Sequence, residues 1–192
     1  MRIIGGEFRG RRLEMPKGAD VRPTPDKVRE ALFNIIKTRV EGESVLDLFA
    51  GSGALGIEAL SRGASSATFV DIKRRCIETI RKNIKGLPLD SDIEIRIYQS
   101  DTLKAIKKLN DSKIRFGLLF LDPPYYGEWV KKCLIYLDRY DIFNHSSLII
   151  CEHFKKDIVP DKVGSLGVMR KVVYGDTGLT FYTRRRDEPS PS

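Results

Sequence analysis

Cysteine and histidine are both scarce in this chain of 192 residues. The three cysteines, Cys76, Cys133 and Cys151, lie far apart without a Cys-x-x-Cys pair, and neither His145 nor His153 has an acid or cysteine at a metal-binding spacing. This pattern predicts neither a metal site nor a disulfide framework. We therefore expect the cysteines to be packing residues and the protein to work in a reducing compartment, the cytoplasm.

Long apolar runs are also absent. No run reaches membrane-spanning length, and the first twenty residues lack the apolar core of a signal peptide. No basic helix with a bulky aromatic face is present, which disfavours binding to a membrane surface. The hydrophobic share of 41% is enough for a core, and the length is typical of one domain with a small appendage.

Negative charge is in the minority, with a net charge of +8 and an isoelectric point near 9.4. Residues 1–40 contain ten Lys or Arg against five Asp or Glu, so most of the excess lies in the first fifth of the chain. A soluble basic surface could account for this charge. Its clustering favours a polyanionic partner such as a nucleic acid.

Residues 1–21 are predicted to form a small basic β-hairpin ahead of the main domain. Ile3 and Ile4 would lie in one arm and Leu13 in the other, with glycines at the turns. A ribbon rich in glycine and arginine can follow a phosphate backbone closely, although an expendable arm could have the same composition. The arginines of this segment that we expect to contact RNA are Arg2, Arg9, Arg11 and Arg12.

The segment Arg22-Pro23-Thr24-Pro25 leads the chain into a predicted helix. Thr24 is expected at its N-cap and Pro25 at its first position. Arg22 is a further candidate for contact with RNA, but it could instead point at a cofactor or at solvent.

Residues 22–186 are predicted to form one α/β domain, and residues 187–192 a polar tail. Strands are expected at 44–48, 67–71, 93–98, 116–121 and 147–152, with helices between them. Several of these strands are nearly continuous apolar runs, which is typical of parallel strands covered on both faces. Residues 168–174 and 179–183 are expected to close the sheet as an antiparallel hairpin.

A glycine-rich turn follows the first predicted strand, with the spacing Gly51-x-Gly53-x-x-Gly56. A strand that turns tightly into a helix exposes backbone N–H groups, and the missing Cβ atoms let a ligand come close. A dinucleotide and S-adenosylmethionine are both compatible with this turn. Asp47, just before the glycines, could hold the ammonium group of S-adenosylmethionine or support the glycine loop.

Acidic residues follow the next two strands. Asp71 could accept both ribose hydroxyls of either cofactor, or cap the next helix. Asp101 could accept the adenine amino group, with Ser100 or the next backbone N–H against the ring, or it could cap a helix from Thr102. The residues predicted to bind the cofactor are Asp47, Phe49, Gly51, Gly53, Asp71, Ile72, Ser100, Asp101 and Thr102.

The tetrad Asp122-Pro123-Pro124-Tyr125 follows the fourth strand and is predicted to be the catalytic loop. In an open parallel sheet it would lie next to the glycine loop. The prolines remove two N–H donors, Asp122 and nearby carbonyls supply acceptors, and Tyr125 supplies a ring for stacking. This combination suits a planar exocyclic amine on a base that has left its helix. Asp122 is too weak a base to ionise that amine, so we expect it to orient the amine and the proton to leave after attack.

Glu152 ends the fifth strand and could face the same site, although its position defines no role. Trp129 and Tyr126 could contact a base or pack in the interior. No residue combination in this region requires a metal ion.

Residues 22–34, 45–64 and 122–125 resemble RsmD, the bacterial 16S ribosomal RNA guanine-N2 methyltransferase, and the opening at 3–13 is similar too. The central motifs occur in many amino-methyltransferases, whereas the opening and the 22–34 block are more specific. The resemblance implies a Rossmann-like, S-adenosylmethionine-dependent methyltransferase fold. Its sheet would have seven mostly parallel strands, with a C-terminal antiparallel hairpin and an added N-terminal hairpin.

The resemblance also assigns roles to residues. Asp47, Gly51 and Gly53 would belong to the cofactor loop, Asp71 to the ribose, Asp101 to the adenine, and residues 122–125 to the target amine. The implied partner is 16S rRNA in the small ribosomal subunit or its assembly intermediate. The expected enzyme is a cytoplasmic monomer that releases S-adenosylhomocysteine.

Three other functions remain open at this point. An adenine-N6 methyltransferase acting on DNA or RNA would use the same tetrad. A nicotinamide oxidoreductase would account for the glycine spacing and Asp71, but it leaves the tetrad and the basic hairpin unexplained. A non-catalytic RNA-binding module would keep its function without the Asp122 carboxylate.

Overall fold

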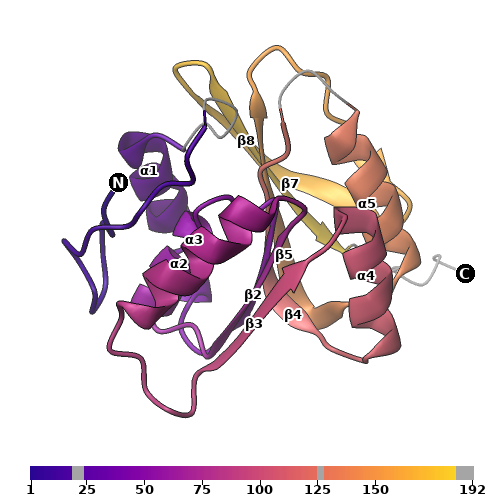
Figure 1. The fold of residues 1–192 in the computed structure, drawn as a ribbon. Coiled ribbons are helices and arrows are strands. Elements are labelled where there is room, and N and C mark those ends of the chain that lie inside the picture. Colours follow the sequence, from indigo (N-terminus) through magenta and orange to yellow (C-terminus); the bar gives the residue numbers. More distant parts are fainter. Residues whose placement is uncertain (19–23, 125–127, 185–192) are drawn as a thin grey trace, which may run out of the picture.

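The computed structural model describes residues 1–18, 24–124 and 128–184. A sheet of eight strands lies at its centre, in the order β3-β2-β1-β4-β5-β8-β7-β6 (Figure 1). The strands are β1 (Ser44–Leu48), β2 (Ser66–Asp71), β3 (Glu94–Gln99), β4 (Phe116–Leu121), β5 (Phe143–Phe154), β6 (Lys162–Val163), β7 (Leu166–Tyr174) and β8 (Thr177–Arg184). The helices are α1 (Asp26–Ile35), the short 3-10 helix η1 (Lys37–Arg39), α2 (Ala54–Ser61), α3 (Arg74–Lys85), α4 (Thr102–Asp111) and α5 (Trp129–Arg139).

The sheet is parallel from β3 to β5 and antiparallel from β5 to β6. The five parallel strands and the closing hairpin predicted from the sequence are therefore confirmed. The strand number is eight rather than seven, because Lys162 and Val163 pair with the start of β7. A strand of two residues is too short to leave a periodic pattern in the sequence.

Helices cover both faces of the sheet (Figure 1). α1, α2 and α3 pack on one face, and α4 and α5 pack on the other. Alternate strand residues enter the two apolar clusters, so Val45 packs beneath α1–α3 and Leu46 beneath α4 and α5. Double coverage explains why β4 is apolar throughout. The three cysteines are free and buried, as predicted.

The N-terminal segment, residues 1–15, forms a small antiparallel ribbon with turns, shorter than the hairpin that we predicted for residues 1–21. Arg2 bridges to Arg12, and the N–H groups of Ile3 and Leu13 donate to the carbonyls of Arg11 and Met1. Outside the paired residues, side chains of α2 accept hydrogen bonds from backbone N–H groups of the segment. Glu58 accepts hydrogen bonds from the N–H groups of Ile4 and Gly5, both at 2.8 Å. The apolar side chains of this segment, Ile3, Phe8 and Leu13, are buried in the cluster beneath α1–α3.

The start of α1 also differs from the prediction. Pro25 occupies the N-cap and no side chain caps the helix. The hydroxyl of Thr24 instead faces Asp122 and Glu152. Among the helices of the described residues, none is long and apolar enough to cross a bilayer.

Candidate active site

Four carboxylates lie at the carboxyl ends of neighbouring strands. The register of β2, β1, β4 and β5 places Asp71, Asp122 and Glu152 at one level and Asp47 two residues deeper. All four face the side covered by α1–α3, because the residues two positions before them pack in that cluster. The strand order also reverses between β1 and β4, where open α/β sheets bind their ligands.

The glycine loop between β1 and α2 has the tight geometry that its sequence predicted. Gly51 and Gly53 have positive φ angles of 57° and 79°, a conformation that favours glycine. Gly56 lets α2 approach β2, because a Cβ there would lie 2.4 Å from the Cε1 atom of Phe69. Asp47 supports the loop from below: its Oδ2 atom accepts a hydrogen bond from the N–H of Gly56 at 3.0 Å.

Asp71 and Asp101 both hold backbone N–H groups. Asp71 accepts from the N–H of Gly51 at 2.9 Å and from that of Lys73 at 2.8 Å, so it connects the glycine loop to the start of α3. Asp101 caps α4 by accepting from the N–H groups of Leu103 and Lys104. The capping role that the sequence left open for Asp101 is therefore present. Carboxylate oxygens have further lone pairs, so both side chains can still accept from a ligand.

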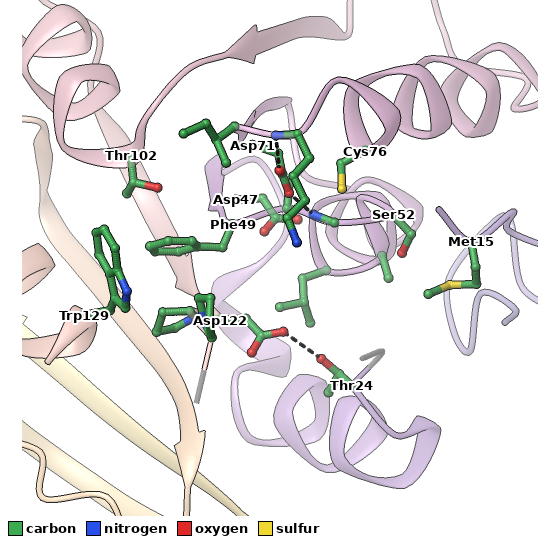
Figure 2. A pocket seen from close by; sticks show the side chains of 18 of the residues that line it. Met15, Thr24, Asp47, Phe49, Ser52, Asp71, Cys76, Thr102, Asp122 and Trp129 are labelled. Atoms are coloured by element: carbon green, nitrogen blue, oxygen red, sulfur yellow. Dashed lines mark hydrogen bonds between the residues drawn. The ribbon is translucent and has the colours of Figure 1, made fainter. Parts of the chain in front are cut away.

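A cavity of about 460 Å³ opens at these strand ends (Figure 2). Its size is within the range of small-molecule and cofactor sites. Ten of the residues that we predicted for the cofactor or the amine line it: Asp47, Phe49, Gly51, Asp71, Ile72, Asp101, Thr102, Asp122, Pro123 and Pro124.

The other predicted residues either do not line the cavity or fall outside the described residues. Gly53 and Ser100 are not among the residues that line the cavity, and Ser100 borders a separate cavity of about 100 Å³. Arg2, Arg9, Arg11 and Arg12 are exposed on the N-terminal segment, outside the lining. Arg22, Tyr125 and Tyr126 fall outside the described residues.

Sequence reasoning missed several lining residues, among them Met1, Met15, Thr24, Lys73 and Cys76. The two methionines reach the cavity only because the N-terminal segment docks beside it. No local sequence pattern predicts that docking. Thr24 had been assigned to a helix cap. Trp129, left open between packing and contact, lines the cavity and meets the ring of Phe49 edge-on at 5.8 Å (Figure 2).

Electrostatic repulsion and burial both act on the carboxylates of the site. The pKa of Asp122 is raised well above its usual value by burial and by the negative charges of Glu152 and Asp47, while the hydrogen bond from Thr24 lowers it. Burial raises the pKa of Asp47 to about 7. Burial and the charge of Asp71 raise the pKa of Cys76 to about 12, so this thiol is not a nucleophile at neutral pH.

No metal centre is indicated in the part of the chain that the structure describes, where no three His, Cys, Asp or Glu side chains are grouped to hold an ion. Acceptors and apolar walls dominate the cavity instead. Carboxylates suit the ammonium, ribose and amine groups of an organic ligand. The exposed Ile72 and the rings of Phe49 and Trp129 offer apolar surface to its rings.

The parallel sheet with its antiparallel end, the glycine loop and the strand-end acids define a Rossmann-like methyltransferase fold. Comparison with known proteins identifies the family. The chain belongs to the family described as Conserved hypothetical protein 95, the RsmD family, whose model matches residues 1–183.

Individual relatives agree with this family. The chain is 40% identical to "Putative rRNA methyltransferase YlbH" of Bacillus subtilis, over 96% of this chain and 100% of that protein. It is 33% identical to "Ribosomal RNA small subunit methyltransferase D" of Escherichia coli, over 96% of this chain and 90% of that protein. Among solved structures, "Putative methyltransferase yhhF" of Escherichia coli superposes with a TM-score of 0.80 at 31% identity, covering 96% of this chain and 98% of that one.

Proposed function

We propose that this protein transfers a methyl group from S-adenosylmethionine to the exocyclic N2 amine of a guanine in 16S rRNA, and releases S-adenosylhomocysteine. The observation that carries the proposal is a single cavity that contains the glycine loop, Asp71 and the Asp122-Pro123-Pro124 segment. Family membership supports the reaction, and two relatives are named as small-subunit rRNA methyltransferases. The proposed setting is the small ribosomal subunit or its assembly intermediate, with the enzyme acting as a cytoplasmic monomer.

The residues of the cavity fit this cofactor. Asp47 and the loop at Gly51 would take the amino-acid end, and Asp71 would accept from the ribose hydroxyls. Ile72 is 61% exposed, which leaves its side chain available to cover one face of the adenine. Asp101 and Thr102 would lie at the edge of that ring. Gly53 would shape the loop without touching the ligand, since it is not among the lining residues.

Asp122 and the prolines would hold the target amine. Neither Pro123 nor Pro124 has an N–H group, so the loop presents acceptors to an NH2 group that has two protons to donate. The cofactor supplies a sulfonium methyl: a bond forms from the amine nitrogen to the methyl carbon while the carbon–sulfur bond breaks and its electron pair stays on sulfur. The nitrogen becomes acidic only after that bond has formed, and Asp122 is then placed to receive its proton. Good orientation alone can contribute up to roughly 7–11 kcal/mol to such a reaction.

The RNA side of the site would be formed by the N-terminal segment. Met1 and Met15 line the cavity, so the segment that carries the exposed arginines Arg2, Arg9, Arg11 and Arg12 is part of its wall. The target base must leave its helix to reach Asp122, since a stacked base could not enter the cavity. Phosphates on either side of it would then meet these arginines. We propose that Arg22 and Tyr125 also contact RNA and base, respectively.

The test is a methyl-transfer assay with radiolabelled cofactor on small subunits, free 16S rRNA and DNA. We expect label in the rRNA, mapped by mass spectrometry to the N2 atom of one guanine. Label in DNA alone, or on adenine N6, would replace this proposal with the adenine-N6 alternative. Binding of NADH without binding of S-adenosylmethionine in calorimetry would establish an oxidoreductase instead.

Asp122→Asn separates catalysis from binding. We expect kcat to fall by roughly 100-fold or more, as is typical when an enzyme loses one group that stabilises the transition state. Cofactor affinity should change only a few-fold. Removing a crowded negative charge should leave the folded state at least as stable. Asp111→Asn, an exposed change at the end of α4, is the matched control. Full activity of the Asp122 variant would support a non-catalytic RNA-binding role.

A further inference from the structure

Arg29 has a fully buried side chain, although that side chain is charged. It is the fourth residue of α1 and is 0% exposed. Its guanidinium donates to the backbone carbonyl of Arg2, to the sulfur of Met1 and to Oδ1 of Asp26, the last at 3.1 Å. The side chain therefore points into the interior and fastens the beginning of the N-terminal segment to α1.

This position is unfavourable for a positive charge. Burial lowers the pKa of Arg29, against the opposite effect of the negative charges of Glu58 and Asp26. Its Nε–H group has no hydrogen-bond partner among the described residues. The charge also lies near the N-terminus of a helix, which is the positive end of the helix dipole. A buried charge of this kind contributes little net stability, so stability alone does not account for an arginine that binds the backbone at Arg2.

The two ends of the N-terminal segment each place a methionine in the cavity wall. At the first end, the buried guanidinium on α1 holds Arg2, which follows Met1. At the other end, Asn83 of α3 accepts from the N–H of Glu14 at 2.8 Å and donates to its carbonyl at 3.1 Å, next to Met15. Both methionines line the cavity. Each of them is therefore adjacent to a residue whose backbone is bound by a helix side chain.

Met15 lies at the end of the cavity that the glycine loop forms. Figure 2 shows it on the side of Ser52 and Cys76, opposite Trp129. The proposed function places the amino-acid end of S-adenosylmethionine at this loop. Apolar side chains over that end would exclude water, which strengthens the attraction between an ammonium group and a carboxylate such as that of Asp47.

We propose that Met1 and Met15 form a wall over the amino-acid end of S-adenosylmethionine, and that Arg29 is the positioning residue that holds this wall in place. This inference rests on the proposed function, which assigns the cofactor. It gives the N-terminal segment a second role beside its proposed contact with RNA. Methionine suits such a wall, because its unbranched thioether side chain adapts to an irregular ligand surface.

Met15→Ala tests the wall directly. Met15 is half-buried and lies outside the helices and strands, so the fold should keep its stability. We expect the Kd for S-adenosylhomocysteine, measured by calorimetry, to rise roughly 3- to 10-fold because apolar contact is lost. Met15→Leu keeps an apolar side chain of similar volume and should recover most of that loss. Met169→Ala, 50% exposed on β7 and outside the cavity lining, is the matched control. An unchanged Kd in Met15→Ala would overturn the proposal.

Arg29→Met tests the positioning role. It replaces the guanidinium by an unbranched apolar side chain, while Glu58 keeps its ion pair with Arg62 at 2.8 Å. We therefore expect the midpoint of urea unfolding to stay the same or rise, and the Kd for S-adenosylhomocysteine to rise as it does in Met15→Ala. Arg29→Lys, which can still donate to the carbonyl of Arg2, should give an intermediate Kd. A loss of stability with an unchanged Kd would mean that Arg29 is purely structural.

Hydrogen exchange of the wild-type protein keeps the proposal testable if Arg29→Met does not fold. Bound S-adenosylhomocysteine should slow amide exchange in the peptide of residues 1–15, because the wall opens less often when it contacts the ligand. Exchange in this peptide that is the same with and without bound ligand would overturn the proposal. If S-adenosylhomocysteine does not bind the wild type at all, the proposed function itself has failed, which is a different result.

Discussion

Asp47 is fully enclosed beneath the glycine loop, where the N–H of Gly56 donates to its carboxylate. One backbone donor does not replace the hydration of a charge, so burial raises the pKa of this side chain from 3.8 to about 7. The unfolded chain loses this proton near pH 4. Between these two values the folded state binds more protons than the unfolded state, so its stability falls as the pH rises.

Asp47→Asn should remove this contribution. Asparagine keeps an oxygen that accepts from Gly56 but has no charge to bury. We expect the free energy of unfolding of the wild type to fall relative to the variant by up to about 4 kcal/mol between pH 4 and pH 8. Urea denaturation of both proteins at several pH values measures this difference. A difference that stays constant with pH would show that Asp47 is ionised in the folded state throughout.

At the scale of elements, α2 and α3 organise both the N-terminal segment and the cofactor loop. Glu58 and Ser61 of α2 bind the backbone of the segment at Ile4, Gly5 and Phe8. From α3, the side-chain amide of Asn83 accepts from the N–H of Glu14 and donates to the carbonyls of Glu14 and Ser52. One side chain thus contacts both the segment and the glycine loop.

The approach of α2 to β2 depends on one missing Cβ atom. Gly56→Ala would place a carbon 2.4 Å from the ring of Phe69, which has no flexible end to move aside. We expect the variant to be destabilised by roughly 1–3 kcal/mol and to bind the cofactor more weakly, because the helix must shift away from the loop. Thermal or urea unfolding measures the first effect and calorimetry the second.

Gly86→Ala at the end of α3 is the matched control. Gly86 has a φ of −79° in the right-handed helical region, and its Cβ would meet nothing closer than 3.5 Å. The same substitution there should be neutral or stabilise by up to about 1 kcal/mol through the unfolded state. Equal losses of stability in both variants would mean that Gly56 does not act by allowing α2 to approach β2 closely.

Elements with a strong local pattern could be predicted from the sequence. The apolar runs gave β1 and β4 with correct bounds, and the glycine spacing and the Asp122 tetrad indicated the two loops that meet at the cavity. Contacts between distant segments could not be predicted. Thr24 looked like a helix cap, Glu152 had no visible partner, and the methionines lie in the wall only because the N-terminal segment docks on α2.

At the scale of the whole molecule, the charge excess lies beside the site. The N-terminal segment docks next to α3, where Arg11 donates to the carbonyl of Gly86 at 3.3 Å. Helix α3 exposes further cations on the same side of the sheet: Arg74, Arg81, Lys82 and Lys85. Two of these are partly neutralised, since Arg74 pairs with Glu78 and Lys82 with Glu14. Under the proposed function, these clustered cations lie where the RNA chain would pass beside the cavity.

This location can be tested by the salt dependence of RNA binding. Arg9 and Arg12 are exposed, and each phosphate contact they make would release counterions. For Arg9→Gln/Arg12→Gln we expect weaker binding of a 16S rRNA fragment and a slope of log K against log salt reduced by roughly 0.7–0.9 per arginine, with cofactor affinity unchanged. Arg139→Gln removes an exposed charge at the end of α5, on the other face of the sheet. An equal loss of slope per arginine in this control would mean that RNA binding responds only to net charge and that the N-terminal segment does not guide RNA into the cavity.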